Sequence, residues 1–188
     1  ARHGEATHNV EQRVSCQPET EENRSKLTTW GREQVKQTAQ GIKDFNVELI
    51  ICSPMYRTKE TAEIFQQFFP NATIEIDERL REMDLEKFNC GLDKEYHSRF
   101  ENQLERFSKR LTQDAETLHD VQNRMFLVLE DLEKRFFGKN IIIVSHGDPL
   151  WMLEAKAQKK SDEDALQMVH PSVGSCRRLN TYVQDLHR

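Results

Sequence analysis

The sequence predicts an α/β fold, a three-layer sandwich in which helices flank both faces of a mostly parallel central sheet. The runs 47–52 and 141–145 are short, mostly apolar and β-branched, which is typical of buried strands. Each run is followed by a segment whose apolar residues recur at helical spacing, and strands that alternate with helices usually form a parallel sheet. With 188 residues, the chain suits a single domain over 1–188 with a substantial core.

The first part of the chain is expected to form a loop and then a helix. Residues 8–28 are polar and rich in turn-forming residues, which predicts the loop. Thr28 or Thr29 is a plausible N-cap for a helix that runs to about Asp44. The apolar positions of this helix are three or four residues apart, so one of its faces can pack on the sheet.

A second helix is expected directly after the strand at 47–52. Ser53 is predicted to cap this helix, and Pro54 to occupy its first turn, where a missing N–H has no cost. The helix should stop at Pro70, because proline cannot continue it. A short strand is predicted at 73–76.

The segment at about 93–136 is highly charged, and its widely spaced apolar residues predict two amphipathic helices. The helical spacing is carried by Phe100, Leu104, Phe107 and Leu111 in the first, and by Val121, Met125, Leu129 and Leu132 in the second. Either a solvated helical face or a cap-like segment over a pocket is consistent with this composition.

The run 141–145 is the clearest strand of the chain, and it leads directly into His146. The Asp-Pro pair at 148–149 predicts the cap and first turn of a helix near 149–158. Residues 173–184 are expected to form a closing strand.

Composition narrows the classes of protein that the chain can belong to. Charged residues make up 31% and hydrophobic residues 36%, and no apolar run is long enough to cross a bilayer. The net charge of −5 argues against a general nucleic-acid surface. The four cysteines are widely spaced, and Cys52 lies in an apolar run, so a reduced thiol and a cytoplasmic location are expected.

Both ends of the chain are abrupt. Ala1 comes just before a glycine-containing motif with no upstream strand, and Arg188 follows without a stop-like composition. We therefore expect a part of a longer polypeptide; a naturally short N-terminus is the alternative.

Five residues have the chemistry of a phosphoryl-transfer site with a histidine nucleophile. They are His3, Arg2, Arg57, Glu82 and His146, most of them next to glycine or close to proline. Arg57 and His146 each follow a predicted strand and lie beside a predicted helix N-terminus, whose free N–H groups favour an anion. Because ligands collect at the carboxyl ends of parallel strands, we expect these residues to converge.

Several segments, in the same order along the chain, resemble the motifs of the histidine phosphatase, or phosphoglycerate mutase-like, superfamily. They are Arg2-His3-Gly4-Glu5 with Asn9, Leu27-Thr28-x-x-Gly31-x-x-Gln34, Ser53-Pro54-Met55-Tyr56-Arg57-Thr58 with Thr61-Ala62-Glu63-Ile64, Leu80-Arg81-Glu82-Met83, and Val144-Ser145-His146-Gly147. The resemblance covers about residues 2–180. It implies a phosphoglycerate mutase-like fold and an enzyme that acts on a small phosphorylated substrate.

The resemblance also implies roles for these residues. His3 would accept the phosphoryl group, and Glu82 would protonate the leaving oxygen. The phosphate oxygens would be held by Arg2, Asn9, Arg57 and His146. This chemistry requires no metal and no cofactor, and it involves neither a membrane nor a nucleic acid. His3 must be neutral to attack, and the nearby guanidinium groups disfavour its protonated form.

For some of these positions a second interpretation is open. Asn9 has loop capping as its alternative role. Neighbouring carboxylates that could replace Glu82 as the acid are Glu78, Asp84 and Glu86. Structural or exposed positions are expected for the remaining histidines, His8, His97, His119, His170 and His187.

The sequence departs from the family pattern in places that bear on function. Residues 83–91 keep clearly only the final glycine of the family's F-G-x-W-E-G segment, which helps to shape the substrate pocket. The R-H-Y-G-type motif and the longer insert of the glycolytic mutases are absent, which favours hydrolysis over mutase chemistry. Asp148 is also less usual after the second histidine, and it places a carboxylate close to the anion site.

Three functional hypotheses follow. The first is a phosphomonoester hydrolase that works through phosphohistidine, and the second is a phosphoglycerate mutase-type phosphotransferase. The third is a non-catalytic phosphate-binding or structural domain of a larger protein. The ending Asp185-Leu186-His187-Arg188 resembles the D-L-H-[RK] element of isoleucyl-tRNA synthetases, so an insertion domain of such an enzyme is one form of the third hypothesis.

Overall fold

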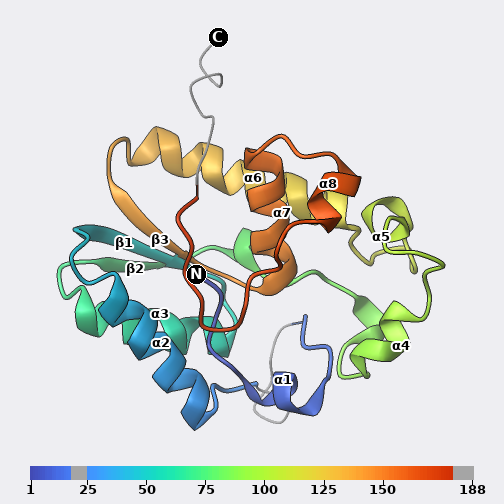
Figure 1. Cartoon of the computed structure of the whole chain (residues 1–188), viewed down its shortest axis with the longest axis horizontal. Helices are drawn as coiled ribbons and strands as arrows, with labels where there is room; N and C mark the ends of the chain where they lie inside the picture. Colours follow the sequence, from blue (N-terminus) through green and yellow to red (C-terminus); the bar gives the residue numbers. More distant parts are fainter. Residues whose placement is uncertain (18–24, 180–188) are drawn as a thin grey trace.

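The computed structural model describes residues 1–17 and 25–179, and its centre is a parallel sheet (Figure 1). The sheet has three strands in the order β2-β1-β3. They are β1 (Val47–Cys52), β2 (Thr73–Ile76) and β3 (Asn140–Val144). Both neighbours of β1 run parallel to it, with Cys52 opposite Ile76 on one side and Val144 on the other. The bounds predicted for β1 and β2 are confirmed, and β3 begins and ends one residue earlier than predicted.

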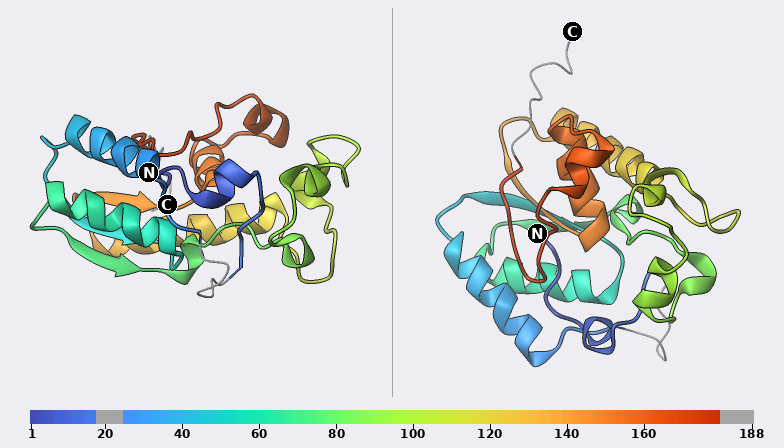
Figure 2. Two further views of the ribbon diagram at one scale, coloured as in Figure 1. Left: turned by 90° about the horizontal axis from the view of Figure 1, so that it is seen from below. Right: turned by 45° about the vertical axis from the view of Figure 1, so that its right-hand side comes forward.

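Helices cover both faces of this sheet (Figures 1 and 2), which confirms the predicted sandwich. The main ones are α2 (Thr29–Gly41) and α3 (Tyr56–Phe68) on one face, and α6 (Leu118–Arg135) and α7 (Gly147–Ala157) on the other. Alternate residues of β1 point to opposite faces. Ile50 and Cys52 pack with α2 and α3, whereas Leu49 and Ile51 pack with α6 and α7. Within the described part of the chain, no helix is long and apolar enough to cross a membrane.

Short elements connect these layers. They are α1 (Thr7–Glu11), the 3₁₀ helices η1 (Glu78–Leu80) and η2 (Glu86–Phe88), α4 (Asp93–His97), α5 (Glu105–Ser108) and α8 (Asp162–Leu166). The prediction of a loop over 8–28 is therefore wrong at its start, where α1 forms. Asn9 accounts for this helix, because its side chain accepts a hydrogen bond from the backbone N–H of Ala6 at 3.0 Å and caps the first turn.

The predicted helical segment 93–136 is only half correct. Its second helix is α6, but the first is divided into α4 and α5, which lie together beyond the end of the sheet (Figure 1). Asn102 interrupts the helix, because its side chain accepts hydrogen bonds from the N–H groups of Leu104 and Glu105 and starts a new helix there. Phe100 instead packs edge-on against Tyr96 with a centroid separation of 5.2 Å.

Three other boundaries differ from the predictions. Helix α3 has Met55, not Ser53, as its N-cap, because the Ser53 side chain is turned toward His146. Helix α7 begins at Gly147, so the Asp-Pro pair at 148–149 lies inside its first turn. Residues 173–179 form no strand, since Gly174 has a φ of +70° that interrupts an extended backbone. Residues 180–184 of that predicted strand, and the ending at 185–188, lie outside the described residues.

All four cysteines lie in the described part of the chain, and all are free. Cys16 and Cys52 are buried, and burial raises the pKa of the Cys16 thiol to about 12 and that of Cys52 to about 11. Both thiols are therefore protonated near neutral pH. The predicted free thiol at Cys52 is confirmed.

A contact between two glycines fixes helix α2 against the N-terminal segment. A Cβ atom on Gly31 would lie 2.0 Å from the carbonyl oxygen of Glu5, and one on Gly4 would lie 2.3 Å from that of Gly31. We expect Gly31→Ala to lower the free energy of unfolding by about 1–3 kcal/mol, because two backbones must separate. The matched control is Gly41→Ala in the same helix, where a Cβ meets nothing within 4 Å. Urea unfolding should show no loss for the control; equal losses would contradict the packing argument.

Candidate active site

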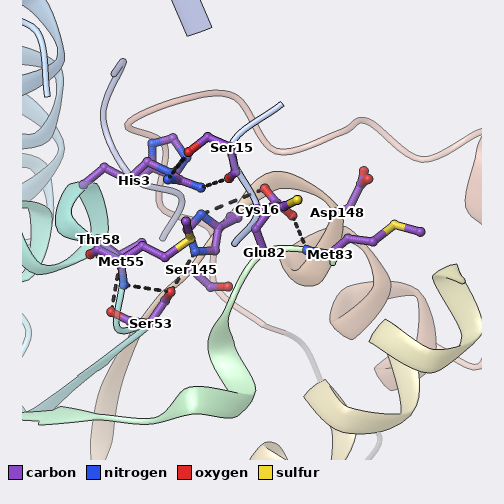
Figure 3. Close-up of polar contacts among 12 residues, drawn as sticks. His3, Ser15, Cys16, Ser53, Met55, Thr58, Glu82, Met83, Ser145 and Asp148 are labelled. Carbon is purple, nitrogen blue, oxygen red and sulfur yellow. Dashed lines mark hydrogen bonds and ion pairs between the residues drawn. The ribbon is translucent and has the colours of Figure 1, made fainter. Parts of the chain in front are cut away.

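Figure 3 shows His3 and Glu82 together with Ser53 and Ser145, the residues that directly follow β1 and β3. Arg2 forms a parallel bridge with Ser145, directly after β3, and the N–H of His3 donates to the Ser145 carbonyl at 3.1 Å. The rings of His3 and His146 lie 5.3 Å apart, and the Nε atom of Arg57 lies 3.2 Å from Nε2 of His3. The predicted convergence of these residues is confirmed.

The hydrogen bonds of His3 define which ring nitrogen carries the proton. Nδ1 lies 2.7 Å from the carbonyl oxygen of Gly4, which can only accept, so Nδ1 carries the hydrogen. Nε2 faces the Nε–H of Arg57, which can only donate, so Nε2 holds the lone pair. Both partners therefore favour a neutral ring whose free nitrogen faces the site.

Electrostatics keeps this ring neutral. His3 is fully buried, and burial is the main cause that lowers its pKa well below the ordinary value for histidine. The positive charges of Arg57 and Arg2 lower the pKa further. The sequence-based expectation named only the arginines, whereas the structure adds burial as the larger cause.

His146 is equally buried, and one of its nitrogens has no partner. Nε2 lies 2.8 Å from the Oγ atom of Ser53, which also accepts a hydrogen bond from the Met55 N–H at 3.4 Å. The Ser53 hydroxyl is then free to donate to Nε2, which favours a hydrogen on Nδ1. Nδ1 has no hydrogen-bond partner and lies 3.9 Å from a carboxylate oxygen of Glu82. A buried polar atom without a partner is rare, and here it is available to a ligand.

Two arginines supply the positive charge of the site. Arg57, in the first turn of α3, is fully buried, and its two terminal nitrogens donate to the hydroxyl and the carbonyl of Ser15 at 3.1 and 2.7 Å. Arg2 donates from Nη1 to the carbonyl of Pro171 at 2.8 Å, and its Nε atom has no partner. The carbonyl groups of Ser15 and Pro171 thus help to hold the two guanidinium groups in place.

Glu82 is the carboxylate that faces the histidines. One of its oxygens accepts from the Met83 N–H at 2.9 Å, and its side chain is 21% exposed. Burial raises the pKa of Glu82 above its ordinary value, and the negative charge of Asp148 raises it further. The rival carboxylates Asp84 and Glu86 are engaged elsewhere, the first by the Glu86 N–H and the second by the hydroxyl of Thr112.

Asn9 has the alternative role that the sequence left open. Besides capping α1, its amide nitrogen lies 3.0 Å from Nε2 of His8. His8 was expected to be structural or exposed, but its ring lies 5.6 Å from that of His3. Burial, followed by the charges of Arg57 and Arg2, lowers the pKa of His8 well below its ordinary value. In the sequence, the only signal for a place of His8 beside the site is its position five residues after His3.

A second group of charged side chains borders the site, and the sequence identified only one member. Asp148, in the first turn of α7, lies 2.7 Å from Arg106 and 3.1 Å from His170. Of the other histidines, His97 and His119 are exposed or half-buried, as expected, and His187 lies outside the described residues. Within residues 1–17 and 25–179, no three His, Cys, Asp or Glu side chains are arranged to hold a metal ion.

A cavity of about 530 Å³ lies elsewhere, beside β3. Its lining includes residues of β3, α6, α7 and the segment 171–179. Of the predicted site residues it contains Arg2 but not His3, Arg57, Glu82 or His146. The site is therefore defined by its side chains and not by this cavity.

Comparisons with known proteins agree with the sequence motifs and the fold. A model of the histidine phosphatase superfamily (branch 1) matches residues 1–185. The uncharacterized phosphatase PhoE of Bacillus subtilis (strain 168) is 30% identical over 146 residues, which are 78% of this chain and 69% of that protein. The probable phosphoglycerate mutase GpmB of Escherichia coli (strain K12 / DH10B) is 30% identical over 161 residues, or 81% and 70% of the two chains.

A solved structure shares the architecture. YhfR of Bacillus stearothermophilus superposes with a TM-score of 0.78 at 26% identity, over 93% of this chain and 85% of that chain. The family match spans nearly the whole chain, and its relatives bear phosphatase and mutase names. The chain belongs to branch 1 of the histidine phosphatase superfamily and is an enzyme of the phosphatase type.

Proposed function

We propose that the protein hydrolyses a small phosphomonoester through a phosphohistidine intermediate on His3, with Glu82 as the proton donor. The observation that supports this most strongly is the orientation of His3. Its unprotonated Nε2 faces the Arg57 guanidinium, 3.2 Å away, in a position where a phosphate group would be gripped as it is attacked.

In the first step, Nε2 of His3 attacks phosphorus, so that a P–N bond forms while the P–O bond to the leaving group breaks. The departing oxygen takes the proton of Glu82, and an alcohol leaves. Burial and Asp148 favour the protonated form of this carboxyl, which suits a general acid near neutral pH. The P–N bond leaves His3 with its Nδ1 hydrogen, which the Gly4 carbonyl accepts.

In the second step, water attacks the phosphoryl group and the P–N bond breaks. Glu82, now ionised, takes the proton of the water, so that inorganic phosphate leaves and both His3 and Glu82 return to their initial states. Dividing the reaction in two lowers the barrier of a very slow hydrolysis.

The phosphate oxygens would be held by donors from separate segments, Arg2, Arg57, His146 and Asn9. Guanidinium groups suit this task because the charge of the transferring group is spread over its equatorial oxygens. The unpartnered Nδ1 of His146 and Nε of Arg2 supply donors that the protein itself leaves unused. Asn9 has an amide hydrogen besides the one directed at His8.

The mutase hypothesis is favoured by one observation, the 30% identity to a probable phosphoglycerate mutase. A single experiment distinguishes it from hydrolysis. The protein is incubated with 3-phosphoglycerate and with an alkyl phosphate in the presence of a metal chelator, and both inorganic phosphate and 2-phosphoglycerate are measured. We expect inorganic phosphate as the product. Formation of 2-phosphoglycerate without phosphate release would support the mutase, and vanadate binding without any turnover would support a non-catalytic domain.

A further inference from the structure

Asp148 joins three segments of the chain at the edge of the site. Its Oδ2 atom accepts from Nη2 of Arg106, on α5, at 2.7 Å. Its Oδ1 atom lies 3.1 Å from Nε2 of His170, in the segment that follows α8. Asp148 itself lies in the first turn of α7, two residues after His146. A single carboxylate therefore connects the cap-like segment, the helix of the second histidine and the C-terminal part of the described chain.

Gly147 makes room for this arrangement. A Cβ atom there would lie 2.5 Å from Cε1 of His170 and 3.2 Å from Cζ of Arg2. Arg2 in turn donates to the carbonyl of Pro171, the residue next to His170. The segment of His170 and Pro171 thus contacts both Asp148 and Arg2, a residue of the proposed phosphate site.

On its other side, Arg106 links Asp148 to the segment of the proton donor. Arg106 is only 7% exposed, and its guanidinium lies 5.8 Å from the centroid of the buried Tyr96 ring. The Tyr96 hydroxyl contacts the sulfur of Met83, the residue after Glu82, at 4.0 Å. Helix α5 is therefore held against the first turn of α7 by a nearly buried ion pair, and it is linked through Tyr96 to the residue after the proton donor.

The charges around the two carboxylates differ. Those that face Glu82 are Asp148 from α7, Arg57 from α3, Arg2 from the N-terminal segment and the ring of His146, together with the Met83 N–H. Those that face Asp148 are Arg106 from α5, His170 and Arg2, with Asp93 and His97 of α4 nearby. Asp148 thus forms a direct ion pair with Arg106, whereas Glu82 makes no direct ion pair with an arginine among the described residues.

We propose that Asp148 is a positioning residue for this reaction: through Arg106 it holds α5 against the first turn of α7, and its negative charge acts on the neighbouring carboxyl of Glu82. This inference rests on the proposed function, in which Glu82 is the proton donor.

The titration of the two groups is consistent with this division of roles. Burial alone would raise the pKa of Asp148, but Arg106 and His170 outweigh it and hold this pKa well below its usual range. For Glu82, burial and then Asp148 raise the pKa. Of the two carboxyl groups, Asp148 is therefore the one whose surroundings favour the charged form, and Glu82 the one whose surroundings favour the protonated form.

The test is the isosteric variant Asp148→Asn, which retains an oxygen acceptor for Arg106 but removes the charge. The readout is the pH dependence of kcat/KM with an alkyl phosphate, because this quantity reports the free enzyme up to phosphoryl transfer. Activity should fall as pH rises through the pKa of Glu82. In the variant, this decline should begin about 0.5–1 pH unit lower, because a like charge next to the acid has been removed.

A second variant separates the charge from the tether. Arg106→Gln breaks the ion pair that holds α5 to Asp148 but leaves the Asp148 charge. We therefore expect KM to rise, while the decline of kcat/KM at high pH does not move to lower pH. The matched control is Asp162→Asn, whose carboxylate pairs with His119 on the surface at 3.0 Å. This control should leave both the profile and KM unchanged.

Each outcome of these experiments has a distinct meaning. A decline at the same pH in Asp148→Asn and wild type would overturn the inference, as would identical changes in Asp148→Asn and Arg106→Gln, which indicate a purely structural role. Failure of the proposed function itself has another signature, namely a decline at high pH that persists in Glu82→Gln.

Discussion

Replacing His3 by alanine is expected to lower the rate of phosphomonoester hydrolysis by about 10⁴-fold or more. The variant lacks the Nε2 atom that is unprotonated and directed at the Arg57 guanidinium. His146 and His8 are not equivalent to it, because the free nitrogen of His146 is the Nδ1 that carries the hydrogen, and Nε2 of His8 faces the amide of Asn9 and not Arg57. The measurement is the release of inorganic phosphate from an aryl phosphate in the presence of a metal chelator.

Removing a buried ring can also weaken the fold, so two comparisons accompany this variant. His3→Gln fills more of the space and should be equally inactive, and thermal unfolding shows whether each protein is folded. His119→Ala removes a surface histidine that pairs with Asp162, and it should keep wild-type activity. Substantial turnover by folded His3→Gln would exclude His3 as the nucleophile.

Glu82→Gln is expected to have the second largest effect, and its size should depend on the leaving group. An alkoxide needs a proton to depart, so phosphoryl transfer from an alkyl phosphate should slow by about 10²–10⁴-fold. A stabilised aryloxide needs little assistance, so the same step with an aryl phosphate should slow by about tenfold or less. The first step is isolated by measuring the rapid initial release of the leaving group, before the phosphoenzyme is hydrolysed.

The pH dependence provides the corresponding check on wild type. The pKa of Glu82 is raised, so its acid form persists above the ordinary carboxyl range, and alkyl phosphate turnover falls only when pH passes this raised value. The pKa of His3 is lowered, so no loss of activity is expected as pH falls through the ordinary histidine value. Equal slowing of alkyl and aryl substrates in Glu82→Gln would argue against an acid role.

Strands β1 and β2 could be predicted from the sequence because their signals are local. The runs 47–52 and 73–76 are apolar or β-branched and are bounded by turn-forming residues, so their limits agree with the structure. The cap-like segment could not be predicted in the same way. Its helical spacing is real, but Asn102 starts a new helix and Phe100 packs against Tyr96, both of which depend on contacts within the folded segment.

The residues of the site also differ in whether the sequence alone could predict their positions. Arg57 and His146 could be predicted to meet, because each follows a predicted strand, and a parallel sheet brings the carboxyl ends of its strands together. His3 was expected there through the family resemblance, and only the structure shows its segment beside β3. The roles of His8, Arg106 and His170 could not. Arg106 and Asp148 are 42 residues apart in the sequence, and only the folded chain places them 2.7 Å from one another.

The proposed mechanism depends on Nε2 of His3 as the atom that receives the phosphoryl group. The most direct measurement uses Glu82→Gln with an aryl phosphate, since this variant retains the first step but lacks the base for the second, so that a phosphoenzyme accumulates. Rapid quench at alkaline pH, followed by mass spectrometry and phosphorus NMR, identifies the residue and the ring nitrogen that carry the label. We expect a single phosphoryl group on Nε2 of His3. A label on Nδ1, a label on another residue, or steady turnover without any phosphoenzyme would contradict it.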